Sequence, residues 1–177
     1  MNKKFIPYAY ANNIFDVDVN FFKNNGFKVL LFDLDNTLLP YSKKVIEGRT
    51  VELINILKKE GLTIYICSNN KGKRVKKIAE VLGVNCSCLM RKPFSGPLKR
   101  LIKRENWSKD EVILIGDQIQ TDIIAGNKAG IRTLLLEPLD PSIEPPWTKF
   151  NRHFDRPKRE KMRKENLLID YKERMYV

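Results

Sequence analysis

Short apolar runs alternate with longer amphipathic stretches through the middle of the chain. Four runs are mostly apolar, as strands buried on both faces of a parallel sheet are, and they lie at residues 28–33, 62–68, 111–117 and 132–139. A weaker strand is predicted at residues 84–90. Each run is short enough to be a strand rather than a buried helix.

The amphipathic stretches between the runs predict helices. Their apolar residues recur at helical spacing in four places, residues 45–60, 72–82, 97–105 and 121–130. Gly61 and Gly83 follow the first two stretches, and glycine suits the left-handed residue that ends a helix. Alternating strands and helices predict an α/β fold, a parallel sheet with helices on both faces.

The flanking segments have a different pattern. Residues 1–27 are predicted to be irregular, and residues 138–157, with five prolines, to be a loop. Residues 157–177 are highly charged and are compatible with one amphipathic helix. We therefore expect a single domain over residues 1–177, with a core at about 28–137, an N-terminal extension and a basic C-terminal tail.

Polar side chains follow every predicted central strand. They are Asp33 and Asp35 after the first strand, Ser68 and Asn69 after the second, Lys92 after the weak strand, and Asp117 and Asp122 after the third. Because functional residues gather at the carboxyl ends of parallel strands, we expect these side chains to form one site.

These residue types suit phosphoryl transfer assisted by magnesium. Asp33 and Asp117 can converge on one Mg²⁺ ion, which prefers carboxylate oxygens. Asp33 is then the candidate nucleophile, forming an aspartyl-phosphate, and Asp35 the candidate acid and base. Ser68 and Lys92 would hold the remaining phosphoryl oxygens, with Lys92 balancing the negative charge.

Other polar and aromatic residues leave alternatives open. Asn69 either donates to phosphate or only fixes the turn. Asp122 either supports the metal and Lys92 or begins a helix, where the dipole favours an acid. Trp107 and Trp147 are predicted to be packing residues.

Four motifs occur in the order found in the haloacid dehalogenase superfamily. DLDNT at 33–37 resembles its D-x-D-x-T signature, ICSN at 66–69 its second motif, Lys92 in RKP its third, and ILIGDQIQTD at 113–122 its fourth. The resemblance spans residues 28–137 and implies a Rossmann-like fold and magnesium-dependent phosphoryl transfer. The implied roles are catalysis by Asp33, Asp35 and Lys92, substrate binding by Ser68, Asn69 and Lys92, and metal binding by Asp33, Asp35, Asp117 and Asp122.

The spacing of the motifs leaves no room for a cap domain. Only one helix and one strand fit between Asp35 and Ser68, and again between Ser68 and Lys92. An uncapped site admits large substrates, such as proteins, nucleic-acid ends or lipid head groups. The stretches FIPYAY, LFDLDNTLLPY and GDQIQTDIIAGNKAG resemble the YqeG-type subfamily, which is similar to mitochondrial phosphatidylglycerophosphate phosphatases. That resemblance implies phosphatidylglycerophosphate as the substrate.

The charge of the chain favours an anionic partner. Thirty-three Lys and Arg residues against 21 Asp and Glu give a net charge of +12. A phosphorylated substrate, an anionic membrane surface and nucleic acid all fit this surplus. The leading hypothesis is a phosphatase. One alternative is a basic RNA- or ribosome-binding module with secondary or lost activity, and another is a phosphatase of phosphoproteins, sugar phosphates or nucleotides.

The apolar patterning also bears on location. No apolar run approaches the roughly 20 residues that a membrane crossing needs, and the N-terminus lacks the pattern of a signal peptide. We expect a cytoplasmic protein, with peripheral contact to an anionic membrane as an option. The aromatic residues of segment 1–27 either form an interfacial foot or, as we favour, cover one edge of the sheet.

Overall fold

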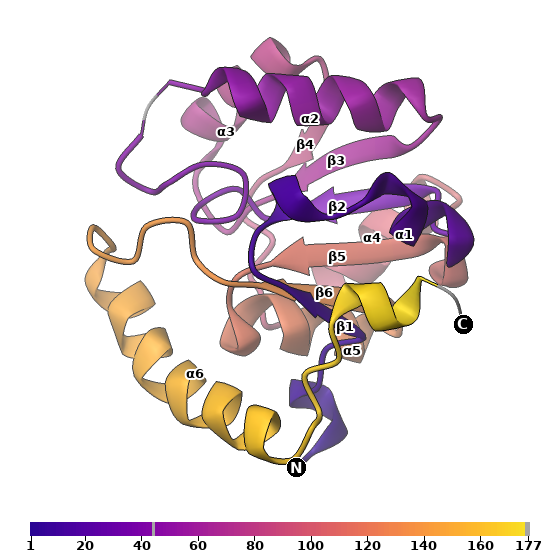
Figure 1. Ribbon diagram of the computed structural model, residues 1–177. Coiled ribbons are helices and arrows are strands. Elements are labelled where there is room, and N and C mark those ends of the chain that lie inside the picture. The colour runs from indigo at the N-terminus through magenta and orange to yellow at the C-terminus, as the bar shows by residue number, and fades with distance from the viewer. Residues whose placement is uncertain (44, 176–177) are drawn as a thin grey trace.

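A computed structural model describes residues 1–43 and 45–175 of the chain. The described residues form one six-stranded sheet with the strand order β1-β6-β5-β2-β3-β4, and every neighbouring pair is parallel (Figure 1). The strands are β1 (Ala9–Ala11), β2 (Val29–Phe32), β3 (Thr63–Cys67), β4 (Asn85–Ser87), β5 (Val112–Gly116) and β6 (Arg132–Leu136). The parallel sheet and its five predicted strands are confirmed.

Helices cover both faces of the sheet, as the sequence predicts (Figure 1). They are α1 (Val19–Asn24), α2 (Gly48–Lys59), α3 (Gly72–Leu82), α4 (Gly96–Arg104), α5 (Ile124–Ala129) and α6 (Pro146–Lys164). On one face Leu30 and Phe32 of β2 pack in a cluster with Ile54 of α2. On the other face Leu31 of the same strand packs with Leu98 of α4. None of the described helices combines the length and the apolar character that crossing a membrane requires.

The N-terminal segment is part of the fold, so the prediction of an irregular extension is wrong. Strand β1 pairs with β6 at the edge of the sheet, with Tyr10 opposite Leu135. In α1 both Phe21 and Phe22 are fully buried, and the Phe21 ring packs against Tyr171 from the end of the chain. Phe21 and Phe22 therefore pack in the hydrophobic core and do not form an interfacial foot.

The C-terminal segment differs most from the sequence-based prediction. Helix α6 begins at Pro146, inside the stretch 138–157 that was expected to be a loop, and ends at Lys164. Proline suits the first turn of a helix because the N–H that it lacks has no partner there. Asn166, two residues after the last residue of the helix, adopts a left-handed conformation with φ of 52°, so the charged stretch 157–177 is not one helix.

Candidate active site

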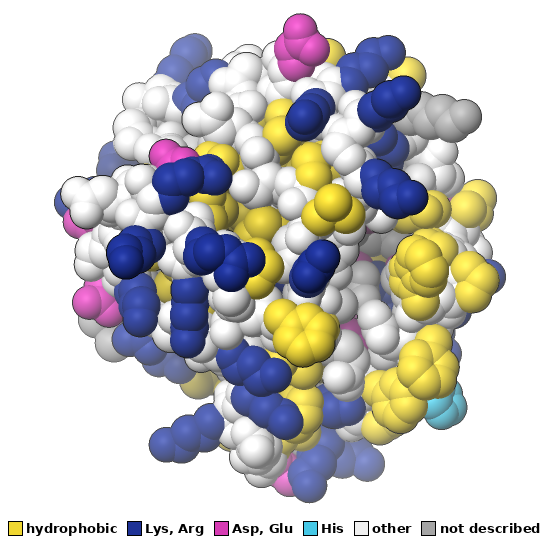
Figure 2. Space-filling view, turned by 180° about the vertical axis from the view of Figure 1, so that it is seen from behind, with side chains coloured by type: hydrophobic (Ala, Val, Ile, Leu, Met, Phe, Trp, Pro, Cys, Tyr) yellow, Lys and Arg dark blue, Asp and Glu magenta, His cyan; other side chains and the backbone are white. Residues whose placement is uncertain are grey.

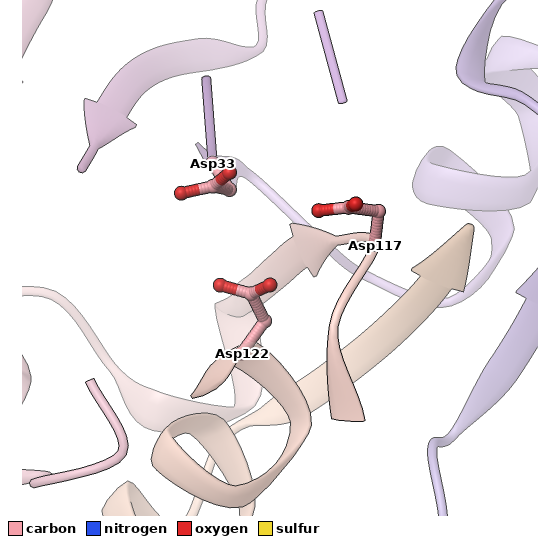
Figure 3. Close-up of side chains that lie close together, drawn as sticks. All are labelled: Asp33, Asp117 and Asp122. Atoms are coloured by element: carbon pink, nitrogen blue, oxygen red, sulfur yellow. The ribbon is translucent and has the colours of Figure 1, made fainter. Parts of the chain in front are cut away.

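The loops that follow β2, β3 and β5 bring the predicted polar residues to one edge of the sheet. Figure 1 shows the arrowheads of β2 and β5 pointing to the side where α6 begins. Asp33 follows β2 and Asp117 follows β5, while Asp122 comes from a π-helical turn at Ile119–Ile123. Carboxylate oxygens of the three acids lie within 4.8 Å of one another, and all three residues are buried (Figure 3). Gly116 permits this arrangement, because a Cβ atom at that position would collide with the Asp122 carboxyl group.

Lys92 is the buried cation that contacts two of these three acids, Asp33 and Asp122. Its Nζ atom donates hydrogen bonds to Asp33 Oδ1 and Asp122 Oδ1, both at 2.6 Å, and to the Cys67 carbonyl at 2.8 Å. Burial alone would lower the pKa of Lys92, but the carboxylates of Asp122 and Asp33 raise it above its usual value. The lysine therefore stays charged although its residue is only 5% exposed.

Asn69 holds the loop that carries Lys92. Its Oδ1 atom accepts a hydrogen bond from the Lys92 backbone N–H at 2.8 Å, and its Nδ2 atom donates to the Lys92 carbonyl at 3.0 Å. Of the two interpretations left open by the sequence, this pairing fits the one in which Asn69 fixes a turn. Ser68 is buried beside it, and Ser68 Oγ accepts a hydrogen bond from the Asn70 backbone N–H at 3.1 Å.

The three carboxylates carry more negative charge than Lys92 balances. Burial raises the pKa of Asp33 well above its usual value; Lys92 opposes this rise, and Asp122 and Asp117 add to it. Burial likewise raises the pKa of Asp117 to about 6, against the effect of Arg152. A hard divalent cation would relieve this repulsion, and a compact set of buried carboxylate oxygens fits Mg²⁺.

The Asp35 side chain lies outside this three-carboxylate group. Its two oxygens accept hydrogen bonds from Arg74 Nη1 and Asn70 Nδ2, each at 2.5 Å. Arg74 also donates to the Lys43 carbonyl at 3.1 Å. Asp35 lines the same pocket as Asp33 but makes its hydrogen bonds to other residues. A metal-binding role for Asp35 stays a prediction, whereas its placement suits a separate acid and base.

Helix α6 and the loop before it supply site residues that the sequence did not predict. Arg152 forms an ion pair with the Asp117 carboxylate and donates to the Asp117 carbonyl at 2.8 Å. Glu144 pairs with Arg152 at 2.7 Å and accepts a hydrogen bond from Asn36 Nδ2 at 2.6 Å. Arg152 of α6 and Glu144, in the loop before α6, thus together tie the loop after β5 to the loop after β2.

Two more residues of α6 hold the loop after β5. Asp155 accepts hydrogen bonds from the backbone N–H groups of Ile119 at 2.9 Å and Gln120 at 3.1 Å. Arg159 donates to the Asp117 carbonyl at 2.6 Å and to the Leu136 carbonyl at 2.9 Å. These contacts fix the backbone that carries Asp117 and Asp122.

Replacing Arg152 tests this connection. Arg152→Met is expected to lower the free energy of unfolding by about 3 kcal/mol, because it leaves Asp117 and Glu144 buried without their cation. Urea denaturation with EDTA present measures the change. Arg156→Met, an exposed position on the same helix, is the matched control and is expected to have little effect. Equal stability of the two variants would show that α6 does not hold the site through Arg152.

A small pocket of about 80 Å³ lies between the loops after the central strands and the start of α6. Asp33, Asp35, Ser68 and Lys92 lie in its wall together with Pro145, Trp147, Thr148 and Asn151 at the start of α6. Trp147 is 68% exposed, so the prediction that it is a packing residue is wrong. Trp107, by contrast, packs edge-on against Tyr65, with 5.6 Å between ring centroids.

Comparison with known proteins identifies relatives of this chain. A family model described as haloacid dehalogenase-like hydrolase matches residues 43–130. The probable phosphatase YqeG of Bacillus subtilis is 33% identical over 156 residues, which cover 88% of this chain and 90% of that protein. Phosphatidylglycerophosphate phosphatase 1 of Arabidopsis thaliana is 30% identical over 154 residues, which cover 79% of this chain and 43% of the plant protein.

A solved structure shares the fold at low sequence identity. The cobalt-bound deoxy-D-mannose-octulosonate 8-phosphate phosphatase of Haemophilus influenzae superposes with a TM-score of 0.51 at 15% identity. The match covers 64% of this chain and 70% of that chain.

Proposed function

Because the chain belongs to the haloacid dehalogenase-like hydrolases and is a phosphatase of the YqeG type, we propose that it is a magnesium-dependent phosphomonoesterase that acts on phosphatidylglycerophosphate. Family membership and fold class agree with the resemblance found in the sequence. The observation that carries the proposed chemistry is the buried group of Asp33, Asp117 and Asp122. Lys92 pairs with two of these acids, Asp33 and Asp122, and Asp35 is held apart from the group.

The three grouped acids would hold the cation. When bound by Asp33, Asp117 and Asp122, Mg²⁺ would neutralise negative charge on the phosphoryl group. The positively charged Lys92 would hold a negatively charged phosphoryl oxygen. Its Nζ atom lies 2.6 Å from Asp33 Oδ1, so it would be close to a phosphoryl group attached to Asp33. The Ser68 hydroxyl, which accepts a backbone hydrogen bond, keeps its own proton available for another phosphoryl oxygen.

Asp33 and Asp35 would divide the covalent and proton-transfer steps. A carboxylate oxygen of Asp33 attacks phosphorus, and the bond from phosphorus to the substrate oxygen breaks. Asp35 gives its proton to that departing oxygen. In the second step Asp35 takes a proton from a water molecule, which attacks phosphorus and releases phosphate and the free Asp33 carboxylate. Arg74 and Asn70 keep Asp35 oriented for both transfers.

The surface around the pocket supports a large amphiphilic substrate. Among the described residues, most exposed large hydrophobic side chains fall in three segments near this edge of the sheet: Tyr41 and Val45; Leu89 and Phe94; and Ile143, Trp147, Phe150 and Phe154. Figure 2 shows hydrophobic side chains gathered on one flank of the molecule, with many Lys and Arg side chains on the adjoining face. Apolar side chains bordered by cations suit an anionic lipid surface.

Similarity to the plant phosphatidylglycerophosphate phosphatase supports the same substrate. The test is a panel of phosphate esters, each assayed with magnesium and with EDTA: phosphatidylglycerophosphate in mixed micelles, a sugar phosphate, a mononucleotide and a phosphopeptide. We expect the lipid to give the highest kcat/KM and EDTA to remove the activity. A soluble metabolite hydrolysed far better than the lipid would refute the lipid assignment, and full activity in EDTA would refute the metal requirement.

A further inference from the structure

A second cavity adjoins the catalytic pocket. It has a volume of about 580 Å³, and we call it the side cavity. Its lining residues are Tyr41, Ser42, Asn69, Asn70, Lys71, Arg74, Leu89 and Trp147. Tyr41, Asn69, Asn70 and Trp147 also line the catalytic pocket, so the two spaces share a wall. The mechanism above uses none of the volume of the side cavity.

The side cavity is positively charged. Lys71 and Arg74 line it, and its lining residues include no acid. Arg74 reaches across the shared wall to Asp35 with its Nη1 atom, and its guanidinium carbon lies 5.9 Å from the centre of the Tyr41 ring. Lys71 is exposed and makes no ion pair within the described part of the chain. The cavity therefore contains two cations: Arg74, which its contact with Asp35 already orients, and Lys71, which is available to bind an anion.

Part of the lining of the side cavity is largely apolar. Tyr41, Leu89 and Trp147 provide this part, and Leu89 is 57% exposed. The backbone of Leu89 has a φ of 54°, in the left-handed region that leucine rarely adopts. Such strain at an exposed apolar residue is typical of ligand sites, where the surrounding structure maintains it. A hydrocarbon group that entered the cavity would remove the apolar surface of these side chains from water, which is favourable.

We propose that the side cavity is a second substrate subsite, which binds an anionic phosphodiester group and the hydrocarbon beside it while the phosphomonoester reaches Asp33. This inference rests on the proposed function, because phosphatidylglycerophosphate carries a monoester and a diester phosphate joined through one glycerol unit. Adjacent pockets with a shared wall suit two phosphates so joined. Lys71 is the specificity-determining residue, since it meets the diester without contacting Asp33 or Asp35.

Charge reversal at Lys71 tests the subsite. The substrates are glycerol 3-phosphate, which has only the monoester, and deacylated phosphatidylglycerophosphate, which has both phosphates and is fully soluble. For Lys71→Glu we expect kcat/KM for the two-phosphate compound to fall about tenfold, mainly through KM, because an attraction becomes a repulsion. The value for glycerol 3-phosphate is expected to stay within about twofold of wild type.

Lys73→Glu is the matched control. Lys73 is also exposed, lies two residues further along the chain in α3, and does not line the side cavity. The same change of net charge at Lys73 is expected to leave the preference between the two substrates unchanged. Three results would overturn the subsite. The first is an equal loss of kcat/KM in Lys71→Glu and Lys73→Glu, and the second is an equal loss for both substrates in Lys71→Glu. The third is a wild-type enzyme that does not prefer the two-phosphate compound. Failure of the proposed lipid substrate is distinguishable from failure of the subsite, because the panel of phosphate esters described above tests the lipid directly.

Discussion

Asp33→Asn is expected to abolish phosphatase activity while the protein stays folded. An amide cannot attack phosphorus, so kcat should fall by about four orders of magnitude or more. Stability should change little, because Lys92 keeps its ion pair with Asp122 and the variant removes a carboxylate whose pKa is raised by burial and by the neighbouring acids. Phosphate release from a chromogenic ester measures activity, and thermal unfolding in EDTA measures stability.

A matched control separates the loss of the nucleophile from the loss of a negative charge. Asp110→Asn makes the same substitution at an exposed position before β5 and is expected to retain wild-type activity. Substantial activity in Asp33→Asn would mean that another group attacks phosphorus. Loss of activity together with loss of cooperative unfolding would assign Asp33 a structural role instead.

Lys92→Met is expected to give the largest loss of stability. The buried Nζ atom contacts Asp33 and Asp122, and its removal leaves both carboxylates without their cation. Breaking a buried ion pair from one side costs about 3–5 kcal/mol of the free energy of unfolding. Activity should also be lost, because Lys92 balances the charge of the transferred group. Urea denaturation in EDTA at pH 7 measures the change.

The pH dependence of this loss follows from the direction of the carboxylate pKa shifts. Asp33 and Asp117 have raised pKa values in the folded protein, that of Asp117 reaching about 6. Acids with raised folded pKa values destabilise the folded state above those values, and stability is regained as they take up protons on acidification. The deficit of Lys92→Met should therefore shrink from pH 7 toward pH 5.

Two further variants check this interpretation of Lys92. Adding Asp122→Asn to Lys92→Met should restore part of the lost stability, because one unpaired carboxylate disappears. Lys99→Met, at an exposed position on α4, should change stability little. A Lys92→Met protein as stable as wild type would contradict the view that the lysine offsets the acidic group.

The central strands could be predicted to within one or two residues because burial on both faces leaves a continuous apolar run. Val29–Phe32 and Val112–Gly116 show this pattern, and each is followed directly by an acid that the structure places in the site. Strand β1 has only three residues, and its sequence AYA gives no such run. Its position is fixed by pairing with β6, and a pairing between distant segments cannot be predicted from the local sequence pattern.

The contribution of α6 could not be predicted from the sequence for two physical reasons. Prolines before and within Pro146–Lys164 indicated a loop, although Pro146 lies in the first helical turn, where proline is tolerated. Arg152 is 35 residues from Asp117 in sequence, so their ion pair depends on the path of the whole chain. The pairing of Arg74 with Asp35 is equally non-local, since 39 residues separate them.

The division of labour between Asp33 and Asp35 is tested most directly by trapping the phosphorylated enzyme. In Asp35→Asn the second step lacks its base, whereas an ester with a good leaving group, such as p-nitrophenyl phosphate, needs no acid for the first step. Rapid mixing of this variant with the ester and magnesium should give a burst of about one nitrophenolate per protein molecule. Mass spectrometry of the quenched protein should then find one phosphoryl group on Asp33. Turnover without a burst, or a phosphoryl group on another residue, would contradict the proposed mechanism.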